Sequence, residues 1–315
     1  METESVLRWL RNSQRRIQRN GVRGAIGATK PVYVKALQQV LPDGGGESIF
    51  AREWDLLVIL DACRFDLLSE VASTNEYLFL TDVDTFRSLD STTQAWMARN
   101  FTADHRTEMR HTAYVCGNPF SADELNAEAF ALLDEVWKYG WDDELGTLPP
   151  RAITDRTIAA GRNRNPDRII AHYMQPHNPF VGGENPRQRK SIRKWGEEST
   201  PDIWRQLEDG TVDFARVWAD YRATLEYVLE EVALLLNNIN AERVVITADH
   251  GNAIGEWGLY GHPPNLPFEC LRTVPWAKTT ASDANTHTPT TERKQPATED
   301  DETQVADRLD ALGYR

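Results

Sequence analysis

The sequence predicts an α/β fold in which a mostly parallel central sheet carries helices on both faces, a three-layer sandwich. Two observations predict it. Short runs of branched aliphatic residues recur along the chain, as in strands buried on both faces. Amphipathic helical patterns separate these runs, and strands that alternate with helices form a parallel sheet. At 315 residues the chain is long enough for one such domain with a substantial core.

The first 50 residues are expected to form a basic helical arm ahead of a main domain at residues 51–277. Residues 5–19 set apolar side chains beside five arginines, and a second short helix is expected at residues 31–40. The arm carries eight Arg or Lys against four Asp or Glu, whereas the rest carries a net charge of about −17. The arm can pack on the acidic body or lie on an anionic membrane surface, and both readings stay open.

Five segments are predicted as strands: residues 54–61 (WDLLVILD), 77–83, 112–116, 168–174 (RIIAHYM) and 243–248 (RVVITA). The longest helix is expected at residues 211–238, where apolar residues recur at 3.6-residue spacing. Residues 278–302 are rich in Thr, Pro, Asp and Glu, so a flexible linker is expected there, followed by a C-terminal helix at residues 303–315.

Composition narrows the class of protein. The formal net charge of −13 argues against a general nucleic-acid binder, because phosphate backbones are bound by Lys and Arg. Arg outnumbers Lys 28 to 7, which together with the acid excess suggests adaptation to high salt, although a GC-rich genome gives the same bias. Three scattered cysteines form neither a disulfide framework nor a zinc cluster. Without a membrane-spanning run or a secretory signal, a cytoplasmic location is expected, with peripheral membrane contact left open.

Polar side chains follow three of the predicted strands. Asp61 ends the first strand, Asp249 and His250 end the last one, and His177 lies just past the strand before it. Because the carboxyl ends of parallel strands meet at one edge of a sheet, these four residues are expected to converge. Carboxylates with imidazoles suit Zn or Mn, whereas an all-oxygen set would favour Mg or Ca. A lone Asp is more often a helix cap, but an acid next to an imidazole, followed by Gly251, favours ligation.

Around these residues the chain resembles the alkaline phosphatase and sulfatase superfamily. Residues 247–276 (TADHGNAIGEWGLYGHPPNLPFECLRTVPW) are similar to the C-terminal metal motif of sulfatases and phosphoethanolamine transferases. Residues 58–66 (VILDACRFD) resemble the first metal-binding strand of the superfamily. Residues 173–180 (YMQPHNPF) resemble the His-x-Pro segment of sulfatases and lipoteichoic acid synthases. The resemblance spans roughly residues 54–276 and the last dozen, and it implies an alkaline phosphatase-like fold with a sulfatase-like catalytic domain.

The resemblance also implies the residues of a metal site. It makes Asp61, Asp249 and His250 the ligands of a divalent ion, together with a nucleophilic hydroxyl, for which Thr93 is favoured. His177 and His262 would contact the ester group or protonate the leaving group.

The nucleophile of this superfamily stands at a helix N-terminus, where the helix dipole and free N–H groups favour anions. Residues 88–101 supply three hydroxyls before a predicted helix, those of Ser91, Thr92 and Thr93. Thr93 ranks first and Ser91 second. One of the three hydroxyls can also serve as a helix cap.

Two departures from the superfamily pattern refine the prediction. No cysteine stands in the Cys-x-Pro-x-Arg context that sulfatases modify, so true sulfatase activity is disfavoured. Tyr173 takes the position at which two-zinc relatives have an aspartate, so one metal ion is expected.

The sequence therefore predicts a metal-dependent hydrolase of phosphate, rather than sulfate, esters that acts through a Thr or Ser nucleophile. Two alternatives stay open: a transferase that moves a phospho-alcohol group onto a glycan or lipid, and a catalytically inactive binding module with the same fold. The expected substrate is a small-molecule or glycan- or lipid-linked ester, which the sequence does not identify further.

Overall fold

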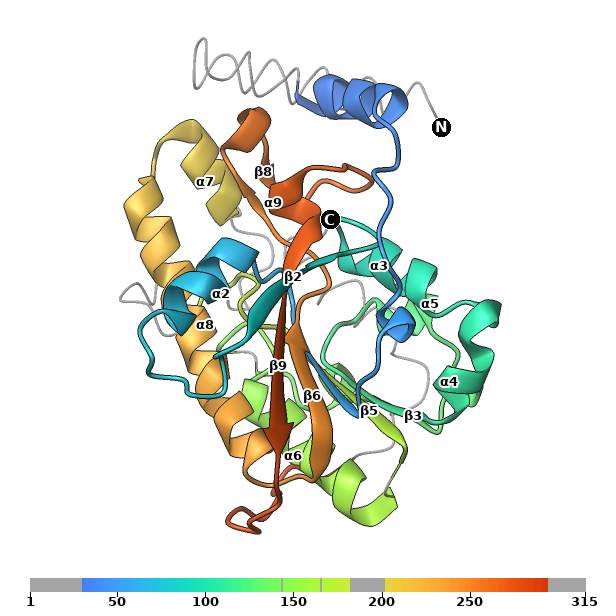
Figure 1. Cartoon of the computed structure of the whole chain (residues 1–315). Coiled ribbons are helices and arrows are strands. Elements are labelled where there is room, and N and C mark those ends of the chain that lie inside the picture. The colour runs from blue at the N-terminus through green and yellow to red at the C-terminus, as the bar shows by residue number, and fades with distance from the viewer. Residues whose placement is uncertain (1–29, 143, 165, 182–201, 294–315) are drawn as a thin grey trace.

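A computed structural model of the chain describes residues 30–142, 144–164, 166–181 and 202–293 (Figure 1). Its centre is a seven-stranded sheet in the order β2-β9-β6-β1-β5-β3-β4. The five strands from β6 to β4 in this order pair in parallel, and β9 runs antiparallel to both of its neighbours. The predicted fold class, a mostly parallel sheet between layers of helices, is confirmed.

The strands of this sheet are β1 (Leu56–Leu60), β2 (Val83–Arg87), β3 (Thr112–Cys116), β4 (Leu132–Glu135), β5 (Arg168–Tyr173), β6 (Ala241–Thr247) and β9 (Thr273–Ala281). A separate two-stranded sheet pairs β7 (Ala253–Ile254) with β8 (Tyr260–Gly261). All five side chains of β1 are buried, as expected for a central strand covered on both faces.

Helices lie on both faces of the sheet (Figure 1). One layer contains α2 (Phe65–Ala72), α6 (Pro150–Arg164) and α8 (Phe214–Leu236), in which α8 packs on the other two. The other layer contains α3 (Thr93–Asn100), α4 (Arg106–Arg110) and α5 (Ser121–Glu124). Two short helices, α7 (Ile203–Asp209) and α9 (Glu269–Arg272), flank the small sheet and the start of β9.

The long helix predicted from apolar spacing is α8. Its buried residues Val217, Tyr221, Leu225, Val228 and Val232 recur every three or four positions and face the core. The Asp213 side chain caps its N-terminus by accepting a hydrogen bond from the Arg216 N–H at 2.8 Å. Amphipathic packing and a side-chain cap together explain why this segment is the longest described helix.

The strand predicted at residues 77–83 is wrong, because β2 begins only at Val83. Tyr77 and Leu80 are buried, but they lie in turns. The Tyr77 hydroxyl lies 3.1 Å from a carboxylate oxygen of Glu230 in α8, so this aromatic side chain marks packing against a helix. β4 and β9 were not predicted, since β4 is short and β9 contains Pro275 and several polar residues.

The flexible linker expected from residue 278 is corrected by the structure. Residues 278–281 complete β9, and residues 282–293 continue as a segment, here called the C-terminal strap, bound to α6 and α8. Asp283 pairs with Arg162 at 2.7 Å. The Asp155 carboxylate in α6 accepts hydrogen bonds from His287 and from the backbone and hydroxyls of Thr290 and Thr291.

Several predicted segments lie outside the described residues: the helix at 5–19, the linker residues 294–302 and the helix at 303–315. Residues 30–40 are helical, in agreement with the second predicted helix. None of the helices within the described ranges combines the length and the apolar character needed to cross a membrane.

Replacement of Asp155 by Ala should lower the free energy of unfolding by about 2 to 4 kcal/mol, because it leaves several donors of the C-terminal strap without an acceptor. Burial acts to raise the pKa of Asp155, but the hydrogen bonds from His287, Thr290 and Thr291 outweigh it and hold the pKa below its ordinary value. The stabilisation is therefore complete above pH ~4 and is lost as the pH falls through the lower folded-state pKa.

Urea unfolding across this pH range measures the effect. Asp167→Ala is the matched control, because that side chain is 75% exposed and should change stability little. An Asp155→Ala protein with the stability and acid sensitivity of the unmodified chain would show that the strap contributes nothing.

Candidate metal centre and active site

Two buried carboxylates meet at the carboxyl edge of the sheet. Asp61 follows β1 and Asp249 follows β6, and these strands are parallel neighbours. Both side chains are completely buried. The Ala62 N–H donates to Asp249 Oδ1 at 3.0 Å, so the end of one strand holds the carboxylate of the other. Together with His172 on β5, the two aspartates place one ligand atom each within 4.8 Å of the others.

His250 and Thr93 adjoin the same carboxylates. His250 Nε2 lies 3.8 Å from Asp61 Oδ1 and 3.6 Å from Asp249 Oδ2. Its Nδ1 donates to the Gly251 carbonyl at 2.8 Å, which leaves the Nε2 lone pair directed at the carboxylates. Thr93 Oγ1 donates to Asp249 Oδ2 at 2.6 Å and lies 3.3 Å from His250 Nε2. The four residues expected to form the metal site thus lie together.

The three neighbouring hydroxyls have different environments. Thr93, the first residue of α3, directs its hydroxyl to Asp249. Thr92 is the helix cap, and its side chain accepts from the Ala95 N–H. The Ser91 hydroxyl donates to the Pro263 carbonyl at 2.7 Å, away from the carboxylates. The structure therefore gives the cap and the contact with the buried acids to different residues.

His177 and His262 form a pair beside the metal cluster. Their Nε2 atoms lie 3.0 Å apart, and the His262 ring centre is 4.5 Å from that of His250. His177 Nδ1 donates to the Asn178 carbonyl at 2.5 Å, so its Nε2 accepts and His262 Nε2 donates. Burial lowers the pKa of His177 to about 4 and that of His262 well below its ordinary value, so both rings are neutral near pH 7.

Asp249 remains ionised in this setting. Burial acts to raise its pKa, but the hydrogen bonds donated by the Thr93 hydroxyl and the Ala62 peptide group act to lower it, and the pKa lies below its ordinary value. The site therefore keeps a charged carboxylate in contact with a hydroxyl and two imidazoles.

Sequence reasoning missed two residues, His172 and Asn118. The Asn118 amide donates to Asp61 Oδ2 at 2.8 Å and so orients that carboxylate. It follows β3, so the rule that identified Asp61, a polar residue just past a buried strand, would also have found it. His172 lies inside β5, one residue before the strand ends, and that rule passes over it.

The residues fit a divalent ion. His172 is completely buried, yet its Nε2 has no hydrogen-bond partner among the described residues, a state that costs about 1 to 3 kcal/mol. An ion beside Asp61 and Asp249 would give this nitrogen a partner and would neutralise two buried acids. Carboxylates with imidazoles suit Zn or Mn. The identity of the metal and the presence of one ion stay predictions.

The loop that carries His262 is fixed at many points. Gly251 packs so closely on the Cys270 carbonyl that any added Cβ would clash with it. Further along, Asn265 N–H donates to Asp90 at 3.2 Å, and Gln38 donates to the Pro264 carbonyl at 2.7 Å. Arg64 donates to the Asn252 carbonyl at 2.5 Å. We refer to residues 252–270 as the His262 loop.

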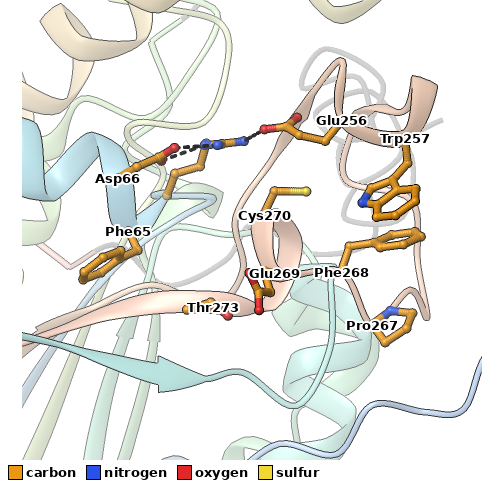
Figure 2. Close-up of a pocket in the computed structure, with 10 residues that line it drawn as sticks. Phe65, Asp66, Glu256, Trp257, Pro267, Phe268, Glu269, Cys270 and Thr273 are labelled. Carbon is orange, nitrogen blue, oxygen red and sulfur yellow. Dashed lines mark hydrogen bonds and ion pairs between the residues drawn. The ribbon is translucent and has the colours of Figure 1, made fainter.

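A pocket of about 580 Å³ is lined in part by residues of the His262 loop, and Figure 2 shows its lining side chains. The guanidinium of Arg64 spans it from Asp66 to Glu256, and the Trp257 ring stacks on Phe268 with centres 5.3 Å apart. Glu269 also lines it, so carboxylates outnumber the single cation of the lining. Its lining includes no residue of the metal cluster.

Trp137 and Trp204 are 0% and 5% exposed. The Trp204 indole N–H donates to the Asn178 side chain at 3.0 Å. These rings therefore pack inside the domain rather than offering an aromatic surface.

Comparison with known proteins finds structural likeness without sequence matches. No protein-family model and no curated protein sequence match the chain. The integral membrane protein lipooligosaccharide phosphoethanolamine transferase A from Neisseria meningitidis matches with a TM-score of 0.47 and 14% identity, over 91% of this chain but 60% of that one. The periplasmic domain of phosphoethanolamine transferase EptC from Campylobacter jejuni has a TM-score of 0.47, 16% identity and coverages of 82% and 87%. A putative sulfatase from Bacteroides thetaiotaomicron has a TM-score of 0.46, 13% identity and coverages of 82% and 70%.

These proteins are of the kinds that the sequence motifs resemble, but the function proposed below rests on the geometry of the site. The comparison corrects one prediction. A cytoplasmic location was expected from the sequence, whereas the similar structures include domains described as periplasmic.

Proposed function

We propose that this chain is a metal-dependent enzyme that cleaves phosphate esters through Thr93. One observation carries the proposal. The Thr93 hydroxyl stands at the N-terminus of α3 and donates at 2.6 Å to Asp249, inside a buried cluster that includes Asp61 and His250. A buried hydroxyl against an ionised carboxylate, at a helix end that favours anions, is the arrangement of an activated nucleophile.

In the proposed reaction the Thr93 oxygen attacks phosphorus while its proton passes to Asp249. The new bond joins Thr93 Oγ1 to phosphorus, the ester bond breaks, and the leaving alcohol takes up, through solvent, the proton that Asp249 received from Thr93. Thr93 then carries the phosphoryl group until an acceptor removes it. The N-terminal peptide groups of α3 face the negative charge that develops on the phosphoryl oxygens.

Asp61, Thr93, Asp249 and His250 would hold the ion, and Asn118 would keep Asp61 in position. A divalent ion bound there lowers the pKa of a hydroxyl in contact with it and offsets the charge on the phosphoryl group. Because its own pKa stays low in the buried site, Asp249 passes the Thr93 proton on rather than keeping it.

His262 and His177 are proposed to act on the substrate and the acceptor. His262 Nε2–H is the donor of the pair, so it is the group that can contact a non-bridging oxygen. His177 Nε2 is an acceptor, suited to take a proton from the incoming water or alcohol. General acid or base catalysis of this kind contributes about 100- to 10,000-fold.

Thr93→Ala should abolish turnover of an aryl phosphate diester while leaving metal binding measurable, because it removes the nucleophile and keeps the carboxylates. Asp249→Asn should abolish both metal retention and turnover. Ser91→Ala is the matched control and should keep turnover within a few-fold, since its hydroxyl binds backbone groups of Pro263 and Leu266 and not the metal-site carboxylates. The readouts are release of the aryl alcohol and metal content per chain.

Turnover that survives in Asp249→Asn, or is lost in Ser91→Ala but not in Thr93→Ala, would contradict these roles. Metal-loaded protein that cleaves neither phosphate nor sulfate esters would instead favour the inactive binding module.

A transferase that moves a phospho-alcohol group onto a glycan or lipid is the second candidate. Asp61, Thr93, Asp249 and His250 are all completely buried. Limited access of bulk water favours transfer to a bound hydroxyl over hydrolysis. Both candidates share the phospho-enzyme step and differ only in the acceptor.

Transfer and hydrolysis separate when a labelled phosphodiester is incubated with glycan or lipid acceptors. A transferase should place most of the label on the acceptor and release free product slowly in its absence, because the covalent intermediate waits for the acceptor. Phosphorus NMR and mass spectrometry of the products measure the ratio, with Thr93→Ala as the blank. Free release that no acceptor changes would identify a hydrolase.

Peripheral membrane contact is proposed for the helical residues 30–40. This helix packs on the His262 loop through Gln38, while Val32 and Val40 are 61% and 81% exposed. The sequence just before it is rich in arginine. Exposed apolar side chains beside basic residues suit an anionic bilayer surface and a lipid-linked ester.

Val40→Asp should reduce co-sedimentation of the full chain with vesicles containing anionic phosphatidylserine, since it adds negative charge and removes apolar surface. Glu242→Asp, a conservative exchange at the far end of the sheet, is the control and should leave binding unchanged. Equal binding of both variants, or no binding of the unmodified chain, would rule out this surface.

A further inference from the structure

We infer that His172 is a direct ligand of the ion, so that two imidazoles, from His172 and His250, hold it together with Asp61 and Asp249. The inference rests on the proposed function only for the presence of the ion. It assigns to the interior of β5 a part of the metal site that sequence resemblance does not indicate.

Burial and hydrogen bonding single out the Nε2 atom of His172. The side chain is completely buried, and a core histidine normally pairs both ring nitrogens. Here Nδ1 lies 2.8 Å from the Tyr114 hydroxyl, whereas Nε2 has no hydrogen-bond partner among the described residues. His172 belongs to the group of three residues whose ligand atoms lie within 4.8 Å of one another.

The hydrogen bond behind His172 is compatible with the tautomer that a metal ligand needs. The Tyr114 hydroxyl lies 2.8 Å from His172 Nδ1, and its oxygen can accept from Nδ1–H. That arrangement leaves a lone pair on Nε2, as the Gly251 carbonyl does for His250.

The distance from His172 to Asp249 distinguishes a metal ligand from a residue that only forms a hydrogen bond to Asp249. His172 Nε2 lies 3.9 Å from Asp249 Oδ2, which is too long for a hydrogen bond. Two ligands of one ion, each about 2.1 Å from it, stand roughly 3 to 4 Å apart. The separations from His250 Nε2 to the two carboxylates, 3.8 and 3.6 Å, fall in the same range.

His172 is packed where it cannot turn away. Its ring stacks on Tyr114 with centres 6.1 Å apart and meets the edge of Trp96 from α3 at 5.8 Å. Trp96 lies on the same helix as Thr93, one turn later. The ligand is thus held in place by the helix that carries the proposed nucleophile.

The test uses the full chain, stripped of metal and reloaded with one equivalent of Zn²⁺. X-ray absorption at the zinc edge counts the imidazoles bound to the ion, and competition with a chelating dye gives the dissociation constant. We expect two imidazoles in the unmodified chain and one in His172→Gln. The matched control, His177→Gln, should keep both.

The affinity data should distinguish a metal ligand from a residue that only orients a ligand. His172→Gln should weaken Zn²⁺ binding by more than the ~10- to 100-fold typical of residues that only orient ligands. Asn118→Ala, which acts through Asp61, should fall within that range and leave the imidazole count unchanged. Circular dichroism of the metal-free variants checks that each is folded.

A single imidazole in the unmodified chain, or an unchanged count and affinity in His172→Gln, would overturn the inference. Should His172→Gln fail to fold, the count in the unmodified chain decides alone. Zinc binding that Asp249→Asn abolishes, while His172→Gln keeps both imidazoles and the affinity of the unmodified chain, would refute the role of His172 and leave the proposed metal site intact. An unmodified chain that binds no zinc would refute both.

Discussion

The structure depends on a costly arrangement, two carboxylates buried side by side where neighbouring parallel strands end. Asp61 and Asp249 are completely buried, and charges in such a place are tolerated only when donors or cations surround them. The hydrogen-bond donors belong to different parts of the chain: the Asn118 amide, the Ala62 and His250 peptide groups and the Thr93 hydroxyl. The elements around the site are arranged to supply these contacts.

This constraint also explains why the proposed nucleophile and the proposed metal site form one unit. The hydroxyl of Thr93 stabilises Asp249, and the dipole of α3 places positive potential where the negative charge gathers. Ser91 connects the turn before α3 with the His262 loop. A shift of α3 would therefore disturb the carboxylate, the hydroxyl and the facing histidines together.

Much of the fold could be predicted from the sequence because its signals are local. The aliphatic run of β1, the apolar stripe of α8 and the Asp249-His250 pair can each be recognised from neighbouring residues in the sequence. His172 could not be found this way. Its place beside the site depends on contacts with Tyr114 and Asp249, which lie far away in the chain. The strand prediction near Tyr77 was wrong because residues that pack against α8 and residues buried in a sheet are both apolar, so the sequence does not distinguish them. The strap at residues 282–293 was missed because Thr, Asp and His there bind Asp155 and Arg162, contacts that composition cannot reveal.

The many attachments of the His262 loop have a consequence for recognition. Because Arg64, Ser91, Asp90 and Gln38 already fix this loop, its conformational entropy is lost during folding rather than when a ligand arrives. A loop that is rigid before a ligand binds selects ligands by shape and excludes those that would require the loop to change conformation. Ligands that bind can then differ from one another only in the parts that do not contact the His262 loop.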